Sequence, residues 1–127
     1  MTELVIDHDF LRTYLGNHNI YRLVRFDLYK AGWDGPGSMP KNRNSVLLMQ
    51  RYFRKFYPED FKAPEPNPSG LSIFMTHEGN ISLNWVVNKK IVELTFLDDD
   101  KSVILYEEND EKETTLDINT DDIPVYI

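Results

Sequence analysis

From Leu71 onward the sequence takes on a period of two, and this alternation constrains the fold more than any other feature. Apolar and polar residues alternate in four short runs, which begin near Leu71, Ile81, Ile91 and Val103 and are separated by short polar turns. Short alternating strands joined by tight turns are typical of an antiparallel meander, with one face on the core and the other toward water. A fifth strand is expected at 114–118, at an edge of the sheet.

Helical spacing characterises the residues before the sheet. Residues 8–31 place apolar side chains on one stripe, so the pattern predicts a helix. Asp7 or Asp9 is suited to cap its first turn, because a carboxylate accepts hydrogen bonds from the free N–H groups there. The run 16–19, Gly-Asn-His-Asn, predicts a break, and Gly32 is expected to end the helix.

A second helix is predicted from about Pro40 to Tyr57, with Ser38 as its N-cap. Its basic residues, Arg43, Arg51, Arg54 and Lys55, adjoin the aromatic residues Tyr52, Phe53 and Phe56, which we expect to face the core rather than nucleic acid. The prediction is an α+β fold, with two or three N-terminal helices packed on a four- or five-stranded antiparallel β-meander. The chain is expected to be one domain, 1–127: helical over 1–57, a proline-rich linker over 58–70, and a sheet with an acidic C-terminal segment over 71–127.

A glycine-rich turn separates the two predicted helices. It reads Gly32-Trp33-Asp34-Gly35-Pro36-Gly37-Ser38-Met39-Pro40, and its structural residues are expected to be Trp33, Asp34, Gly35, Gly37 and Ser38. Trp33 should pack under the turn, Asp34 should bond backbone N–H groups, and the glycines should supply positive φ angles. A phosphate-binding loop is disfavoured because such a loop follows a strand and carries a lysine, whereas this turn follows a helix and Asp34 would repel phosphate.

The turn also carries a resemblance. Residues 32–40 resemble the Gly-Trp-Asp-Gly-x-Gly-[Ala/Ser]-x-Pro turn of a group of small uncharacterised bacterial and phage-associated proteins. The similarity extends to Gly79-Asn80-Ile81-Ser82-Leu83-Asn84-Trp85 and covers roughly residues 20–106. It implies a context of mobile elements, in which toxins, antitoxins and defence inhibitors are common, and it transfers no catalytic residue. The acidic segment after Val103 departs from the group's pattern.

Charge is distributed unevenly along the chain. The formal net charge is −7, but residues 1–96 carry +2 and residues 97–127 carry −9. An acidic chain is a poor nucleic-acid binder, because phosphate contacts need positive charge. A basic protein surface is therefore the expected partner, met electrostatically. The predicted partner-binding residues are Asp98, Asp99, Asp100, Tyr106, Glu107, Glu108, Asp110 and Glu111. The alternative, that the acidic segment only aids solubility, stays open.

Several chemistries are disfavoured by the residues available. Without cysteine there is no disulfide, thiolate metal site or cysteine nucleophile. The three histidines form no ligand pair, and 98–100 lacks the glycine and distal glutamate of a calcium loop. No Gly-x-Ser-x-Gly elbow occurs. We therefore expect no metal, no cofactor and no enzymatic activity. The N-terminus lacks a signal peptide's features and no run of eighteen apolar residues exists, so a cytoplasmic protein without a membrane span is expected.

The leading functional hypothesis is a non-enzymatic protein-binding inhibitor or neutraliser, of the antitoxin, immunity or phage counter-defence type. It rests on the missing catalytic constellation, the segregated acidic segment and the resemblance. Two alternatives stay open. One is a small-molecule-binding accessory domain, and the other is a homodimeric interaction protein that pairs through the strand at 114–118.

Overall fold

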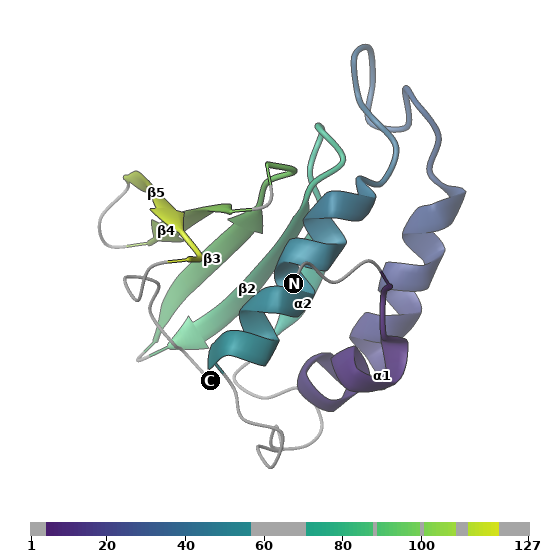
Figure 1. Cartoon of the computed structure of the whole chain (residues 1–127). Coiled ribbons are helices and arrows are strands. Elements are labelled where there is room, and N and C mark those ends of the chain that lie inside the picture. The colour runs from purple at the N-terminus through teal and green to yellow at the C-terminus, as the bar shows by residue number, and fades with distance from the viewer. Residues whose placement is uncertain (1–4, 57–70, 88, 100, 109–111, 120–127) are drawn as a thin grey trace.

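A computed structural model describes residues 5–56, 71–87, 89–99, 101–108 and 112–119 (Figure 1). The predicted linker 58–70, and Asp100, Asp110 and Glu111, lie outside the described residues. The elements, in chain order, are α1 (His8–Arg25), the 3₁₀ helix η1 (Phe26–Leu28), α2 (Arg43–Phe56), β1 (Ser72–Met75), β2 (Ile81–Val87), β3 (Lys90–Phe96), β4 (Ser102–Glu107) and β5 (Glu113–Asp117).

The five strands form one antiparallel sheet in the order β1-β2-β3-β4-β5, so every strand pairs with its neighbour in sequence. The predicted α+β meander is thus confirmed, with two α-helices and one short 3₁₀ helix among the described residues. No helix of the described residues has the length and hydropathy to cross a membrane.

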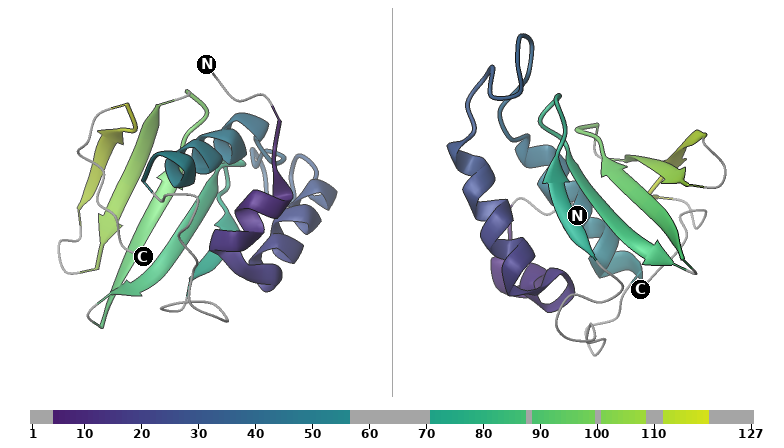
Figure 2. Two further views of the ribbon diagram at one scale, coloured as in Figure 1. Left: turned by 60° about the horizontal axis from the view of Figure 1, so that its bottom comes forward. Right: turned by 180° about the vertical axis from the view of Figure 1, so that it is seen from behind.

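The helices are arranged asymmetrically on the sheet. α2 lies across one face, while α1 lies beside β1 and α2 (Figure 2). The side chains between them form one hydrophobic core, whose largest fully buried members are Trp85, Tyr14, Tyr52, Phe53 and Phe96. No described element covers the opposite face of the sheet, which we call the outer face (Figure 2). Among the described residues, the helices therefore lie on one side of the sheet.

Local sequence signals explain most of α1. The Asp7 carboxylate caps it by accepting the Phe10 N–H at 3.0 Å. Gly16 supplies the predicted break, because its φ of 80° and ψ of 162° are non-helical. The prediction that the helix continues to Gly32 is wrong: α1 ends at Arg25, and after η1 the chain is extended at Tyr29. The Tyr29 ring lies against Trp33, with their ring centroids 5.0 Å apart, so aromatic packing directs the chain into the turn.

The predicted N-cap of α2 is also wrong. The Ser38 hydroxyl accepts the Asp34 N–H at 2.9 Å and donates to the Gly35 carbonyl at 2.8 Å, so it closes the glycine-rich turn instead. α2 begins five residues later, where the Asn42 side chain accepts the Asn44 N–H at 3.0 Å. Long-range bonds delay the helix, because the Asn42 N–H donates to the Gly79 carbonyl at 2.8 Å.

Gly79 permits this close contact between the two turns. A Cβ atom at Gly79 would lie 2.1 Å from the backbone oxygen of Pro40, and the φ of +84° at Gly79 is one that residues with a side chain rarely adopt.

Ser45 connects α2 to the sheet. Its buried hydroxyl accepts the Ile81 N–H at 2.7 Å and donates to the Phe96 carbonyl. These contacts fix α2 over β2 and β3.

Candidate functional site

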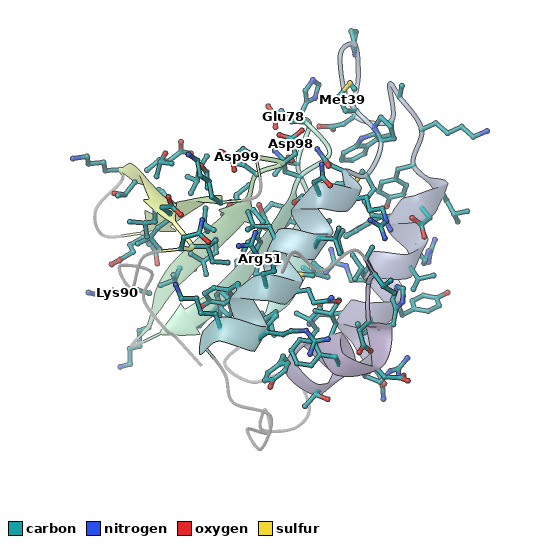
Figure 3. The ribbon with its side chains drawn as sticks, viewed as in Figure 1. Met39, Arg51, Glu78, Lys90, Asp98 and Asp99 are labelled. Carbon is teal, nitrogen blue, oxygen red and sulfur yellow. The ribbon has the colours of Figure 1, made fainter. Side chains whose placement is uncertain are left out.

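The acidic residues predicted to form one surface lie at two opposite ends of β4. Asp98 and Asp99, which are labelled in Figure 3, lie in the turn before it. Glu107 and Glu108 lie at its far end. A six-residue strand spans about 20 Å at roughly 3.3 Å per residue, so the structure does not bring the two pairs together.

Asp99 has a structural role in the turn. Its carboxylate accepts hydrogen bonds from the backbone N–H groups of Lys101 at 3.1 Å and Ser102 at 2.7 Å. Burial by itself would raise the pKa of Asp99, but the hydrogen bonds from Ser102 and Lys101, together with the Lys101 charge, lower it below the ordinary value. The charged carboxylate therefore closes the β3–β4 hairpin.

Glu107 and Glu108 are likewise part of the sheet. The Glu108 carboxylate accepts the Ile91 N–H at 2.9 Å, and its own N–H donates to the Ile91 carbonyl at 2.9 Å, which extends the β3–β4 pairing by one residue. Glu107 pairs in register with Val92, so it shares the core-side face. Both residues, which the sequence analysis assigned to partner binding, thus take part in the pairing of β3 with β4.

The outer face carries a different set of residues. In register, Asn84, Glu93, Tyr106 and Glu113 form one row across β2 to β5, so Tyr106 lies between two carboxylates. A neighbouring row contains Val86 and Ile91, whose side chains are 47% and 42% exposed. We call the first row, with its aromatic ring and two carboxylates, the acidic row, and the exposed Val86 and Ile91 lie beside it.

Glu93 is the electrostatically strained member of the acidic row. Its partial burial in the sheet raises its pKa above the ordinary 4.5, and the nearby charge of Glu113 raises it further. Both effects disfavour the ionised form. The repulsion from Glu113 is the part of this shift that a nearby cation would reduce.

Sequence reasoning placed Tyr106 in the site but missed Glu93 and Glu113. The signal was present in the alternation, because outward positions of successive strands fall into rows once the register is known. Without the register, Glu93 reads as an ordinary solvent-facing residue. The acidic residues at 98–100 and 107–108 were more conspicuous because they are adjacent in sequence.

The basic residues of α2 hold other parts of the chain. Arg51 donates to the Asn119 side chain at 3.0 Å and Lys55 donates to the Ile118 carbonyl at 2.6 Å, which fastens the chain after β5 to the helix. Arg54 lies 4.0 Å from the ring centroid of Phe10. These contacts give the basic face a structural role.

The glycine-rich turn shows a similar structural role. The Trp33 indole N–H donates to the Met39 carbonyl at 2.6 Å, while Gly35 and Gly37 have φ of 97° and 84°. Asp34 was expected to bond backbone N–H groups, but its carboxylate lies 3.3 Å from His77 Nδ1. Across the described ranges, no three His, Cys, Asp or Glu side chains are grouped to hold a metal ion.

An apolar surface on the helical side was not anticipated. Tyr21, Val24 and Leu28 are 62%, 47% and 72% exposed and lie at helical spacing. An open hollow lined by residues 28–33 adjoins Leu28. Because the hollow is open and lined by one continuous segment, it lacks the enclosure typical of a small-molecule site.

Comparison with known proteins adds no relative to this description. No protein-family model matches the sequence, and searches of curated proteins and of solved structures likewise found no match.

Proposed function

We propose that the chain is a non-enzymatic protein-binding module that inhibits or neutralises a basic protein partner. The acidic row Glu93–Tyr106–Glu113 on the uncovered outer face carries this proposal. Tyr106 offers a large, rigid contact surface, and the flanking carboxylates select for lysine or arginine. Burial and the charge of Glu113 both raise the pKa of Glu93, and an arriving cation would reduce the repulsion between the two carboxylates.

The proposal places the partner-binding surface on the outer face of the sheet and not on the acidic residues at the two ends of β4. The carboxylates of Asp99 and Glu108 already accept hydrogen bonds from backbone N–H groups, so they are less available to a partner. Glu93 and Glu113 share one row with Tyr106, and Val86 and Ile91 provide apolar area beside it. Interfaces of this kind pair a central aromatic anchor with polar groups around it.

Two features of the sequence support the same class of function. The absence of cysteine agrees with action in the reducing cytoplasm. The resemblance of the turn at 32–40 to phage-associated proteins agrees with an antitoxin, immunity or counter-defence role. A homodimer and a small-molecule accessory domain remain the alternatives, and neither has a built site among the described residues that would favour it over protein binding.

The test is a pull-down from the native host at low salt and at about 0.5 M salt, where surface charge pairs are strongly screened. The informative variant is Glu93→Gln with Glu113→Gln. The matched control is Glu78→Gln with Asp98→Asn, which removes the same charge from turns at the end of the sheet.

We expect one stoichiometric protein to bind the parent chain and the control at low salt and to be released at high salt. The Glu93/Glu113 variant should bind it at least about tenfold more weakly, equal to about 1.4 kcal/mol. Equal binding by the two double variants would contradict the assignment of the acidic row, and the absence of any partner would contradict the proposed function in that host.

A further inference from the structure

The two edges of the sheet differ in how their backbone groups are satisfied. At the β1 edge, the Asn19 side chain accepts the Ile73 N–H at 3.2 Å and donates to the Leu71 carbonyl at 3.1 Å. The helix α1 thereby covers this edge. β5 is the last strand at the other side of the sheet, and no described element lies beyond it. Of the two edges, β5 is therefore the one that no described element covers.

The register shows which groups of β5 point outward. The Ile118 N–H donates to the Lys101 carbonyl at 2.8 Å, so Ile118 is in a hydrogen-bonded pair with β4. Hydrogen-bonded and non-hydrogen-bonded pairs alternate along antiparallel strands, so Leu116 and Thr114 also face β4. The N–H and C=O groups of Thr115 and Glu113 consequently point away from the sheet, where an added strand would accept and donate.

Charge decides which strand fits. If a second copy paired antiparallel with β5 about Thr115, Glu113 would lie opposite Asp117 of that copy, and like charges directly opposite destabilise a pair. A lysine or arginine opposite Glu113 would instead be attracted by it, while Glu93 lies two strands further inward, about 14 Å from the added strand at roughly 4.8 Å per strand. Because side chains alternate between faces, every second residue of the added strand projects onto this acidic side.

We infer that β5 binds an extended segment of the partner by strand addition, and that this segment carries a basic residue opposite Glu113. The inference rests on the proposed function and specifies how the acidic row is reached. Main-chain bonds to Thr115 and Glu113 hold the segment, and the Glu113 carboxylate selects the basic side chain opposite it.

A proline substitution can test the β5 edge without disturbing the rest of the fold. Thr115→Pro removes an outward N–H without removing a bond to β4, and proline is tolerated at such edge positions. Thr115→Val keeps the N–H and is the matched control. Glu113→Lys is an independent variant, since it reverses the charge and leaves the backbone intact. Circular dichroism and thermal unfolding check the fold of each.

The probe is a short synthetic peptide in which lysine alternates with threonine and valine, titrated into the isotope-labelled full chain and followed by amide resonances. We expect shifts and slowed hydrogen exchange at the amides of Glu113 and Thr115. Thr115→Pro should weaken binding at least about tenfold, and Thr115→Val should stay within about threefold. Glu113→Lys should lose this peptide and bind the equivalent glutamate peptide.

The outcomes distinguish the edge from the face. Shifts at Tyr106 and Ile104 with unchanged amides at Thr115 would overturn strand addition and leave the proposed function standing. Equal binding of a neutral threonine–valine peptide would overturn the selection for basic residues. The lysine peptide could bind at Thr115 while the host partner binds the Glu93/Glu113 double variant as strongly as the parent chain. That result would contradict the proposed function and support an edge that binds basic strands. No response to the lysine peptide at millimolar concentration would overturn the inference.

Discussion

The side-chain oxygen of Asn19 in α1 accepts a hydrogen bond from the backbone N–H of Ile73 in β1 at 3.2 Å, although 54 residues separate them. The Asn19 amide nitrogen bonds the carbonyls of Leu15 and Leu71, at 2.8 and 3.1 Å. Asn19 is 1% exposed, so one side chain occupies the position that a sixth strand would take. It connects the helical half to the sheet and closes that edge.

Replacing Asn19 should therefore lower the free energy of unfolding. Asn19→Ala would leave the Ile73 N–H and the Leu71 carbonyl buried without partners, and we expect a loss of about 2 to 4 kcal/mol in the free energy of unfolding. Urea unfolding followed by circular dichroism measures it. Asn17→Ala, at an exposed position of the same helix, is the control. Equal stability of the two variants would show that Asn19 does not hold the edge.

The contact between the two turns predicts a strong effect at Gly79. Gly79→Ala adds a Cβ that would lie 2.1 Å from the Pro40 oxygen, at a φ of +84°. Gly32→Ala has a similar φ of +88° but meets nothing within 4 Å. We expect roughly 1 kcal/mol of destabilisation at Gly32 and at least about 3 kcal/mol at Gly79, measured by thermal unfolding. Comparable values would mean that backbone strain, and not the clash, dominates.

The environment of Glu93 predicts a pH-dependent stability. Its pKa is raised from 4.5 by burial and by Glu113, so the folded state holds the proton more tightly than the unfolded state. Its contribution to stability is present below about pH 4.5 and is lost as the pH rises through the folded pKa. Glu93→Gln should therefore stabilise the protein at pH 7 and have little effect at pH 4. A stabilisation that stays constant between these pH values would contradict this origin.

The bond from Lys55 to the Ile118 carbonyl predicts a local effect after β5. Lys55→Met should loosen this connection while leaving the core unchanged, because the bond, at 2.6 Å, lies at the end of the strand. We expect the Ile118 amide, which donates to Lys101, to exchange about tenfold faster. Arg12→Met, which breaks an exposed pair with Asp9, should leave that amide unchanged. Unchanged exchange in Lys55→Met would show that this bond does not hold the strand.

Features that depend on near neighbours were predictable from the sequence. The strands follow from alternation, the cap at Asp7 from its carboxylate, and the break in α1 from Gly16. The start of α2 was not predictable. Ser38 is a good capping residue locally, but the bond between Asn42 and Gly79 joins segments far apart in the chain and moves the helix start.

The candidate site shows the same division. Tyr106 could be selected from its position in an acidic segment, whereas Glu93 and Glu113 become neighbours only through strand pairing. Conversely, Asp99 and Glu108 looked like free surface charge, yet each accepts a backbone N–H. A carboxylate's hydrogen-bond partners depend on the register and cannot be read from its flanking residues.

The closed edge at β1 also limits how far copies of this chain can assemble. Cross-strand polymers grow because each unit presents two open edges, one to receive and one to donate. Here Asn19 bonds the outward groups at Ile73 and Leu71, so, in the part of the chain that the structure describes, a copy joined through β5 has no second open edge for a further copy. Pairing through β5 would therefore join two copies at most. An edge strand that can pair is thus compatible with a chain that does not form fibres.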